Sequence, residues 1–288
     1  MNASCRHPSH RSLTHTATSH HSEPSNHTSG YTAPSSHRDR GQSPSLSSWC
    51  AHDSRSLHRG ASSAEPWRLR LGSAFRATGA VAHQSERPLL VYLHDPYCPW
   101  SYGYLPSVRT LLGHIGHEAD LEVVNIGLFH GESVAAAATP MEAVRRSTGA
   151  KFGPGYELTL HDAALSLDSR LAAAAVIGLT SAAPRRELEV LEALQRAFFW
   201  DGRSLSDPST VRDVADELGL DGPAVELFAG SSRAAELADE DIRLAHDLGA
   251  RRGPMLLVSH GHQLDELEGP GTSGEQLLDE YQSVLASR

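Results

Sequence analysis

Apolar residues follow the spacing of strands and helices from residue 87 onward, whereas the first 86 residues show no such pattern. The run Pro88–Leu93 is apolar almost throughout and rich in β-forming residues, which predicts a buried strand. Apolar positions at helical spacing follow from Leu105 to Ile115, and Leu121–Ile126 predicts a second strand that ends at Gly127. Together these segments predict a βαβ unit of about 40 residues.

The middle of the chain, from Ala135 to about Ala250, has a helical pattern. The segment Glu187–Phe199 is strongly amphipathic, and Asp207 and Pro208 are a typical N-cap and first residue for a helix that stops at Gly219. Further helices are predicted over 141–148, 165–177 and 231–248. After this block, residues 254–258 and 263–267 predict a hairpin, and 274–285 a last amphipathic helix.

The order of elements is therefore β-α-β, a helical block, and then β-β-α. Without the block, this is the order of a thioredoxin-type α/β domain. We expect such a domain over 87–288, with an all-helical subdomain inserted at about 131–250, and a disordered tail over 1–86.

The tail differs from the rest of the chain in composition and charge. It contains nineteen Ser, and its nine Arg and five acidic residues give it a charge of +4, so that the total of −10 leaves −14 for residues 87–288. Such a segment buries too little apolar surface to fold alone, apart from a short helix predicted over 66–82. An organelle transit peptide or an upstream extension of the coding frame would each explain this composition.

Composition also excludes several classes of function. Nucleic acid is not an expected partner, because phosphate binding needs clustered basic residues and the predicted domain is acidic. Three scattered cysteines do not form a disulfide scaffold. The start of the chain has no apolar signal region, and no run has the length of a membrane span, so we expect a cytoplasmic protein with no membrane partner.

The main candidate for chemistry is Cys98, at the turn between the first strand and its helix. Unpaired backbone N–H groups and the helix dipole at this position favour a thiolate and predict a thiol pKa in the range of about 3.5–7.5. Pro99 suits the first helical turn, and Tyr97 and Trp100 offer apolar surface beside the sulfur. The alternative is an inert buried cysteine, which this setting makes the weaker interpretation.

Residues before the turn and near the C-terminus are secondary candidates. His94 and Asp95 could tune the pKa of Cys98, although a strand-end histidine and a turn-capping aspartate are the simpler interpretation. Gly253 and Pro254 open a strand, where a proline often has a special geometry.

Other polar and aromatic groups are assigned structural roles. His130 is interpreted as a loop residue, and His260 and His262 as a solvated hairpin pair without a third metal ligand, so no metal site is predicted. We expect Phe198, Phe199 and Trp200 to lie in the core. Solvated helix faces are expected for the acidic residues Glu187, Glu189, Glu192, Glu236, Asp239, Glu240 and Asp241.

Three segments of the chain resemble the DsbA-like branch of the thioredoxin superfamily, in particular predicted bacterial protein-disulfide isomerases. They are Tyr92–Gly103, which contains Cys-Pro-Trp-Ser, Arg196–Asp207 and His246–Val258. The resemblance spans roughly residues 88–285. It implies thiol–disulfide oxidoreductase or isomerase activity, a cis-proline at Pro254 facing Cys98, and a backbone at Gly253 that pairs with bound peptide or glutathione.

The chain departs from that family at Ser101, where redox members carry a second cysteine. Thiol exchange passes through a mixed disulfide that a second thiol resolves, and serine cannot do this. We therefore expect a monothiol mechanism at Cys98 with Ser101 as hydrogen-bond partner, no bound cofactor, and protein thiols or disulfides, or glutathione, as reaction partners. Cys5 and Cys50 lie in the tail and are interpreted as free thiols.

Ser101 also leaves two other functions open. Kappa-class glutathione transferases and 2-hydroxychromene-2-carboxylate isomerases share the fold and use a serine near this turn to activate glutathione, which would make Ser101 the catalytic group. However, their turn resembles Ser-Pro-Tyr rather than Cys-Pro-Trp. The third interpretation is a non-catalytic thioredoxin-like adaptor that presents a partner protein to a protease.

Overall fold

A computed structural model describes residues 87–137, 141–260 and 263–287. The predictions made for residues 1–86, including the short helix and the free thiols Cys5 and Cys50, lie outside the described residues, as does His262.

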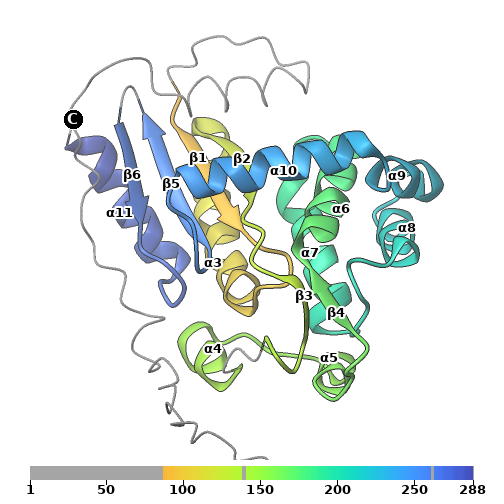
Figure 1. Ribbon diagram of the computed structural model, residues 1–288. Coiled ribbons are helices and arrows are strands. Elements are labelled where there is room, and N and C mark those ends of the chain that lie inside the picture. The colour runs from red at the N-terminus through yellow and green to blue at the C-terminus, as the bar shows by residue number, and fades with distance from the viewer. Residues whose placement is uncertain (1–86, 138–140, 261–262, 288) are drawn as a thin grey trace, which may run out of the picture. The chain divides into compact units, whose positions relative to one another are not determined.

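The centre of the fold is a four-stranded mixed sheet in the order β2-β1-β5-β6 (Figure 1). β1 (Leu89–His94) pairs in parallel with β2 (Asp120–Asn125) and antiparallel with β5 (Met255–His260), which forms a hairpin with β6 (Gln263–Leu267). All four strands were predicted, because their apolar runs are short and bounded by turn residues. The sheet confirms the predicted thioredoxin fold.

Helices cover both faces of this sheet (Figure 1). Alternate residues of β1 point to opposite faces. Leu90 and Tyr92 pack with α3 (Pro99–Ile115) and α11 (Gly274–Ala286), whereas Val91 and Leu93 pack with residues at the C-terminal end of α10 (Ser232–Asp247) and after it. A strand that is buried on both faces has a continuous apolar sequence, which is the pattern of β1.

The segment between β2 and β5 contains the predicted helical insertion. Its helices are α4 (Met141–Thr148), α5 (Pro154–Thr159), α6 (Ser169–Ala182), α7 (Glu187–Phe199), α8 (Pro208–Glu217), α9 (Gly222–Ala229) and α10. Side chains of Asp168, Asp207, Asp221 and Ser231 cap the N-termini of α6, α8, α9 and α10, respectively.

The insertion also contains a small antiparallel sheet that the sequence pattern did not predict. It consists of β3 (His130–Ser133) and β4 (Ser166–Asp168). β4 occupies the start of the segment predicted as helix over 165–177, and the helix begins only after its cap at Asp168. The prediction of an all-helical insertion was wrong here, because a three-residue strand is too short to show an alternating pattern.

Two side-chain predictions for the insertion were also wrong. Trp200 is 40% exposed, since it follows the last residue of α7, while Phe198 and Phe199 are buried as expected. Asp241 does not belong to a solvated helix face: its carboxylate accepts a hydrogen bond of 2.7 Å from the side chain of Asn125 on β2. Burial raises the pKa of Asp241 to about 7.

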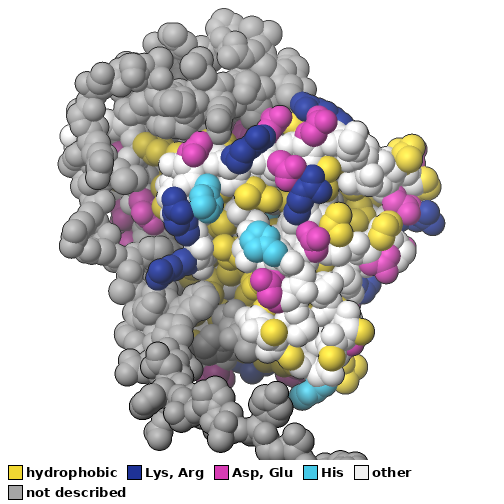
Figure 2. Space-filling view, viewed as in Figure 1, with side chains coloured by type: hydrophobic (Ala, Val, Ile, Leu, Met, Phe, Trp, Pro, Cys, Tyr) yellow, Lys and Arg dark blue, Asp and Glu magenta, His cyan; other side chains and the backbone are white. Residues whose placement is uncertain are grey.

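Acidic and basic side chains lie interspersed over the face in front of α10 and α6 (Figure 2). Arg170 and Asp239 form a two-contact ion pair between these helices at 2.6 and 2.8 Å. Both side chains are about half exposed, so the pair fixes orientation more than it adds stability.

Candidate active site

The turn that carries Cys98 is built by backbone hydrogen bonds and one carboxylate. The N–H of Cys98 donates to the carbonyl of Asp95 at 3.0 Å, and the N–H of Tyr97 donates to the Asp95 side chain at 2.9 Å. Cys98 is then the N-cap of α3, and Pro99 is in the first turn, where its missing N–H costs nothing. The sequence order Asp-Pro-Tyr-Cys-Pro therefore places Cys98 at the helix N-terminus, as predicted.

The sulfur of Cys98 is buried, with 4% of the residue exposed. Burial, followed by the charge of Asp95, raises the pKa of Cys98 to about 11. Hydrogen bonds from the backbone and side chain of Ser101 and from the backbone of Trp100 act in the opposite direction. The expected depression of this pKa was wrong: the donors at the helix start are present, but desolvation outweighs them.

Ser101 lies beneath the sulfur and is fully buried. Its hydroxyl oxygen accepts a hydrogen bond of 3.2 Å from the N–H of Asp95, while its O–H is directed to Cys98. Its carbonyl accepts from the Tyr92 hydroxyl at 3.1 Å. Ser101 is therefore held from three sides and connects the sulfur to the end of β1.

Asp95 joins the turn to the insertion. Its carboxylate accepts from the N–H of Leu128 at 2.7 Å, in addition to the bond from Tyr97, and a further hydrogen bond from Ser169 at the start of α6. Burial raises the pKa of Asp95, and these hydrogen bonds oppose the rise. Asp95 does influence Cys98, and its negative charge acts to keep the thiol protonated.

His94 is fully buried, and neither ring nitrogen has a hydrogen-bond partner among the described residues. The ring stacks on Tyr92, with 5.4 Å between centroids. Burial lowers the pKa of His94 to about 3, so the imidazole is neutral at physiological pH. The sequence suggested that His94 could titrate near pH 7 and tune Cys98, but in the structure its pKa is too low for this.

Gly253 and Pro254 lie at the same end of the sheet as the turn. β1 and β5 pair antiparallel with Leu93 opposite Met255, so one further step of this register places Pro254 opposite His94. Pro254 is buried and Gly253 is half-buried. The β-sheet thus brings together, at one end of its two central strands, sequence segments that are separated by about 150 residues.

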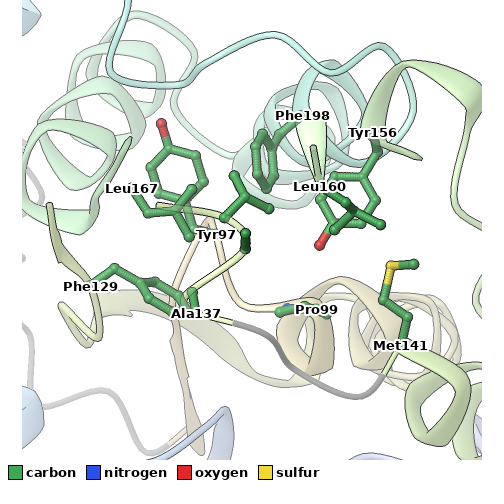
Figure 3. A pocket seen from close by; sticks show the side chains of 11 residues that line it. Tyr97, Pro99, Phe129, Ala137, Met141, Tyr156, Leu160, Leu167 and Phe198 are labelled. Carbon is green, nitrogen blue, oxygen red and sulfur yellow. The ribbon is translucent and has the colours of Figure 1, made fainter. Parts of the chain in front are cut away.

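An apolar cavity of about 310 Å³ lies beside the turn, between it and the insertion (Figure 3). Its walls come from the turn, the residues on either side of β3, strand β4, and helices α4, α5 and α7 with the residue that follows α5. The lining residues are Tyr97, Pro99, Phe129, Val134, Ala135, Ala137, Met141, Tyr156, Leu160, Leu167 and Phe198.

Tyr97 fixes the turn against the insertion. Its ring packs edge-on against Phe198, with 4.7 Å between centroids, and its hydroxyl points away from the cavity (Figure 3). There it hydrogen-bonds the hydroxyls of Ser204 and Ser206 at 3.2 and 2.9 Å and accepts from the N–H of Ser206 at 2.9 Å.

Sequence reasoning missed the side of the site that the insertion contributes. His130, interpreted as a loop residue, is instead the exposed first residue of β3. Tyr156 does line the cavity, and the sequence signal was Gly153-Pro154-Gly155 directly before it. A Cβ at Gly155 would collide with the backbone of Asp201, so only glycine lets α5 approach the end of α7 this closely.

Among the residues that the structure describes, no three His, Cys, Asp or Glu side chains come together as a metal site. No helix in this part of the chain is long and apolar enough to cross a membrane.

Comparison with solved structures finds this fold elsewhere. The cytosolic disulfide reductase DsbM from Pseudomonas aeruginosa is 23% identical with a TM-score of 0.61, over 69% of this chain and 100% of that one. Its structure with glutathione gives 25% identity and a TM-score of 0.56, over 69% and 98%. A candidate protein disulfide isomerase from Nitrosomonas europaea gives 19% and 0.63, over 70% and 99%.

None of the curated proteins compared with this chain matches it. The model of the DSBA-like thioredoxin domain matches residues 90–285, which include the turn, the insertion and the C-terminal hairpin and helix. The chain therefore belongs to the DSBA-like thioredoxin domain family.

Proposed function

We propose that this protein is a monothiol disulfide reductase in which Cys98 forms a mixed disulfide that reduced glutathione then resolves. The observation that carries the proposal is the start of α3: a single cysteine at the N-cap, with the Ser101 hydroxyl and two backbone N–H groups directed at its sulfur. Because position 101 is a serine, the resolving thiol must come from another molecule. Glutathione is a cosubstrate here, and no bound cofactor is needed.

The burial of Cys98 favours the reductive direction. An exchange protein is a strong oxidant when its reduced thiolate is stabilised, and here the surroundings disfavour the thiolate. With a pKa of about 11, only about one thiol in 10⁴ is ionised at pH 7, so the rate should rise with pH. Cys98 is then a slow attacking group that forms a stable mixed disulfide.

The surroundings of the sulfur are consistent with binding of a substrate chain. We assign substrate contact to Pro99 and Trp100 on the helix side and to Gly253 and Pro254 at the facing end of β5. Asp95 is assigned the electrostatic control of Cys98. The Pseudomonas aeruginosa relative is a cytosolic disulfide reductase whose structure was determined with glutathione. This supports glutathione as cosubstrate and a reducing compartment, the cytoplasm, as the site of action.

The position of Ser101 argues against a glutathione transferase that uses this serine. Its hydroxyl is fully buried and already bonded to Asp95 and Cys98, so contact with a glutathione sulfur would require Cys98 to move away. A non-catalytic adaptor is the other alternative, and the test must distinguish it from a reductase.

The test uses the full chain with Cys5→Ser and Cys50→Ser, which leaves Cys98 as the sole cysteine. The protein is incubated with oxidised glutathione between pH 7 and 9 and weighed by mass spectrometry. We expect one glutathione adduct, formed faster at higher pH and removed by reduced glutathione. A further Cys98→Ser substitution should abolish it. If the folded protein stays unmodified while the same protein in urea is modified, Cys98 is an inert core residue and the proposal fails.

A further inference from the structure

The residues that line the cavity beside the turn are mostly apolar, and two of them, Tyr97 and Tyr156, carry a hydroxyl group. Tyr156 lines it from α5, and its hydroxyl points into the cavity on the side of Pro99 (Figure 3). Tyr97, which also has a hydroxyl, directs that group away to the serines of the insertion. Cavities with mainly apolar walls and a single placed polar group are typical of sites for small molecules.

The Tyr156 hydroxyl takes part in none of the hydrogen bonds found among the described residues, although the residue as a whole is only 4% exposed. Buried tyrosine hydroxyls normally find a partner, so this one is available to a bound molecule. Burial raises the pKa of Tyr156 to about 12, and the negative charge of the Cys98 thiolate adds to this rise. The hydroxyl therefore remains a hydrogen-bond donor across the working pH range.

The cavity also stands in a fixed relation to the sulfur. Tyr97 and Pro99, the residues on either side of Cys98, both contribute to its wall. A group bonded to a sulfur atom at Cys98 can therefore enter the cavity, which has the volume of a small apolar group and is at the lower end of known ligand sites.

We propose that this cavity binds the aryl or alkyl group of an apolar thiol that is joined to glutathione in a mixed disulfide. Tyr156 donates a hydrogen bond to the sulfur of the apolar thiol as that thiol leaves. This rests on the proposed reductase function and names its substrate class: mixed disulfides of glutathione with small apolar thiols.

The Cys98 thiolate attacks the glutathione sulfur, a bond forms between these two sulfurs, and the bond to the apolar thiol breaks. The electron pair leaves on the apolar thiolate, which the Tyr156 hydroxyl stabilises in the cavity until solvent protonates it. A second glutathione thiol then attacks the Cys98 mixed disulfide, which gives oxidised glutathione and restores the Cys98 thiol.

The first experiment measures binding without chemistry. S-benzylglutathione is a thioether and cannot undergo exchange, and S-methylglutathione is its counterpart without the ring. In calorimetric titrations of the full chain, S-benzylglutathione should bind about 10- to 100-fold more tightly, which corresponds to burial of one aromatic side chain. Equal affinities would overturn the proposal, whatever the redox activity of the protein.

Two substitutions on neighbouring positions test the location. Leu160→Trp fills the cavity and should weaken binding of S-benzylglutathione at least tenfold, with little effect on S-methylglutathione. Leu158→Trp is the matched control, because Leu158 lies two residues earlier and is 74% exposed. If Leu160→Trp does not fold, the affinities of the unsubstituted protein for S-benzylglutathione and S-methylglutathione still decide whether an apolar group on the sulfur is bound. Binding that both variants retain would place the site elsewhere.

The role of Tyr156 is tested by kinetics with the benzyl thiol mixed disulfide of glutathione. Tyr156→Phe should lower kcat about tenfold or more, the effect of one hydrogen bond to a charged sulfur, and leave KM and the affinity for S-benzylglutathione unchanged. An unchanged kcat would remove Tyr156 from the mechanism. If S-benzylglutathione binds selectively but no mixed disulfide is reduced, the cavity assignment stands and the reductase proposal fails.

Discussion

Replacement of Ser101 by alanine should have two effects of predictable size. The Asp95 N–H, which is buried, loses the acceptor that it has at 3.2 Å, and an unsatisfied buried donor costs about 1–3 kcal/mol of the free energy of unfolding. The Cys98 thiolate loses one hydrogen bond as well. If that bond is worth about 1.4 kcal/mol, the pKa of Cys98 rises further by about one unit.

Urea unfolding and alkylation kinetics measure these two effects separately. At pH 8, a rise of about one pKa unit should slow iodoacetamide alkylation of Cys98 about tenfold, in the chain without Cys5 and Cys50. Ser107→Ala is the control: this serine is on the same helix, and its side chain makes no hydrogen bond to any of the described residues. Equal stability and equal alkylation rates for the two variants would refute the assignment of Ser101 as the support of the sulfur.

Three further predictions concern Ser101, Asp95 and Asp241. Ser101→Cys should convert the turn to a dithiol, so that mild oxidation yields an intramolecular disulfide with Cys98 and a mass loss of two hydrogens; persistence of two free thiols would contradict this. Asp95→Asn should lower the pKa of Cys98 and speed its alkylation, because it removes the nearby charge, while the melting temperature falls, since an amide cannot accept from Leu128 as the carboxylate does. Burial raises the pKa of Asp241 from 3.8 to about 7, so its contribution to stability should be present below pH 3.8 and be lost as pH rises through about 7. Asp241→Asn should therefore flatten the slope of the unfolding free energy against pH between these values. An unaltered slope would exclude Asp241 as its source.

The sheet and the longer helices could be predicted from the sequence because each carries its own signal. β1 is a continuous apolar run and α7 a regular amphipathic one, and the structure has α7 at the predicted bounds of Glu187–Phe199. β4 could not be predicted, because its three residues Ser166–Asp168 gain their strand form from pairing with β3 and not from a local pattern.

The chemistry of Cys98 shows a different limit. The sequence correctly placed it at a helix N-terminus, where backbone donors favour the thiolate. Its pKa depends also on how much water reaches the sulfur, and that is set by the packing of the turn against the insertion. Tyr156 illustrates the same point, since it lies 58 positions after Cys98 and reaches the site only through the fold. Burial of this kind is a property of the tertiary structure.

The hydrogen bonds of Tyr97 to Ser204 and Ser206 have a mechanical consequence. They tie the residue before Cys98 to the loop between α7 and α8, so an outward movement of the insertion would pull on the turn. Asp95 makes a second tie of this kind, through Leu128. In the proposed mechanism, a movement of the insertion that admits a substrate would therefore also bring water to the sulfur. Because burial is the main cause of the raised pKa of Cys98, the same movement would favour ionisation of the thiol.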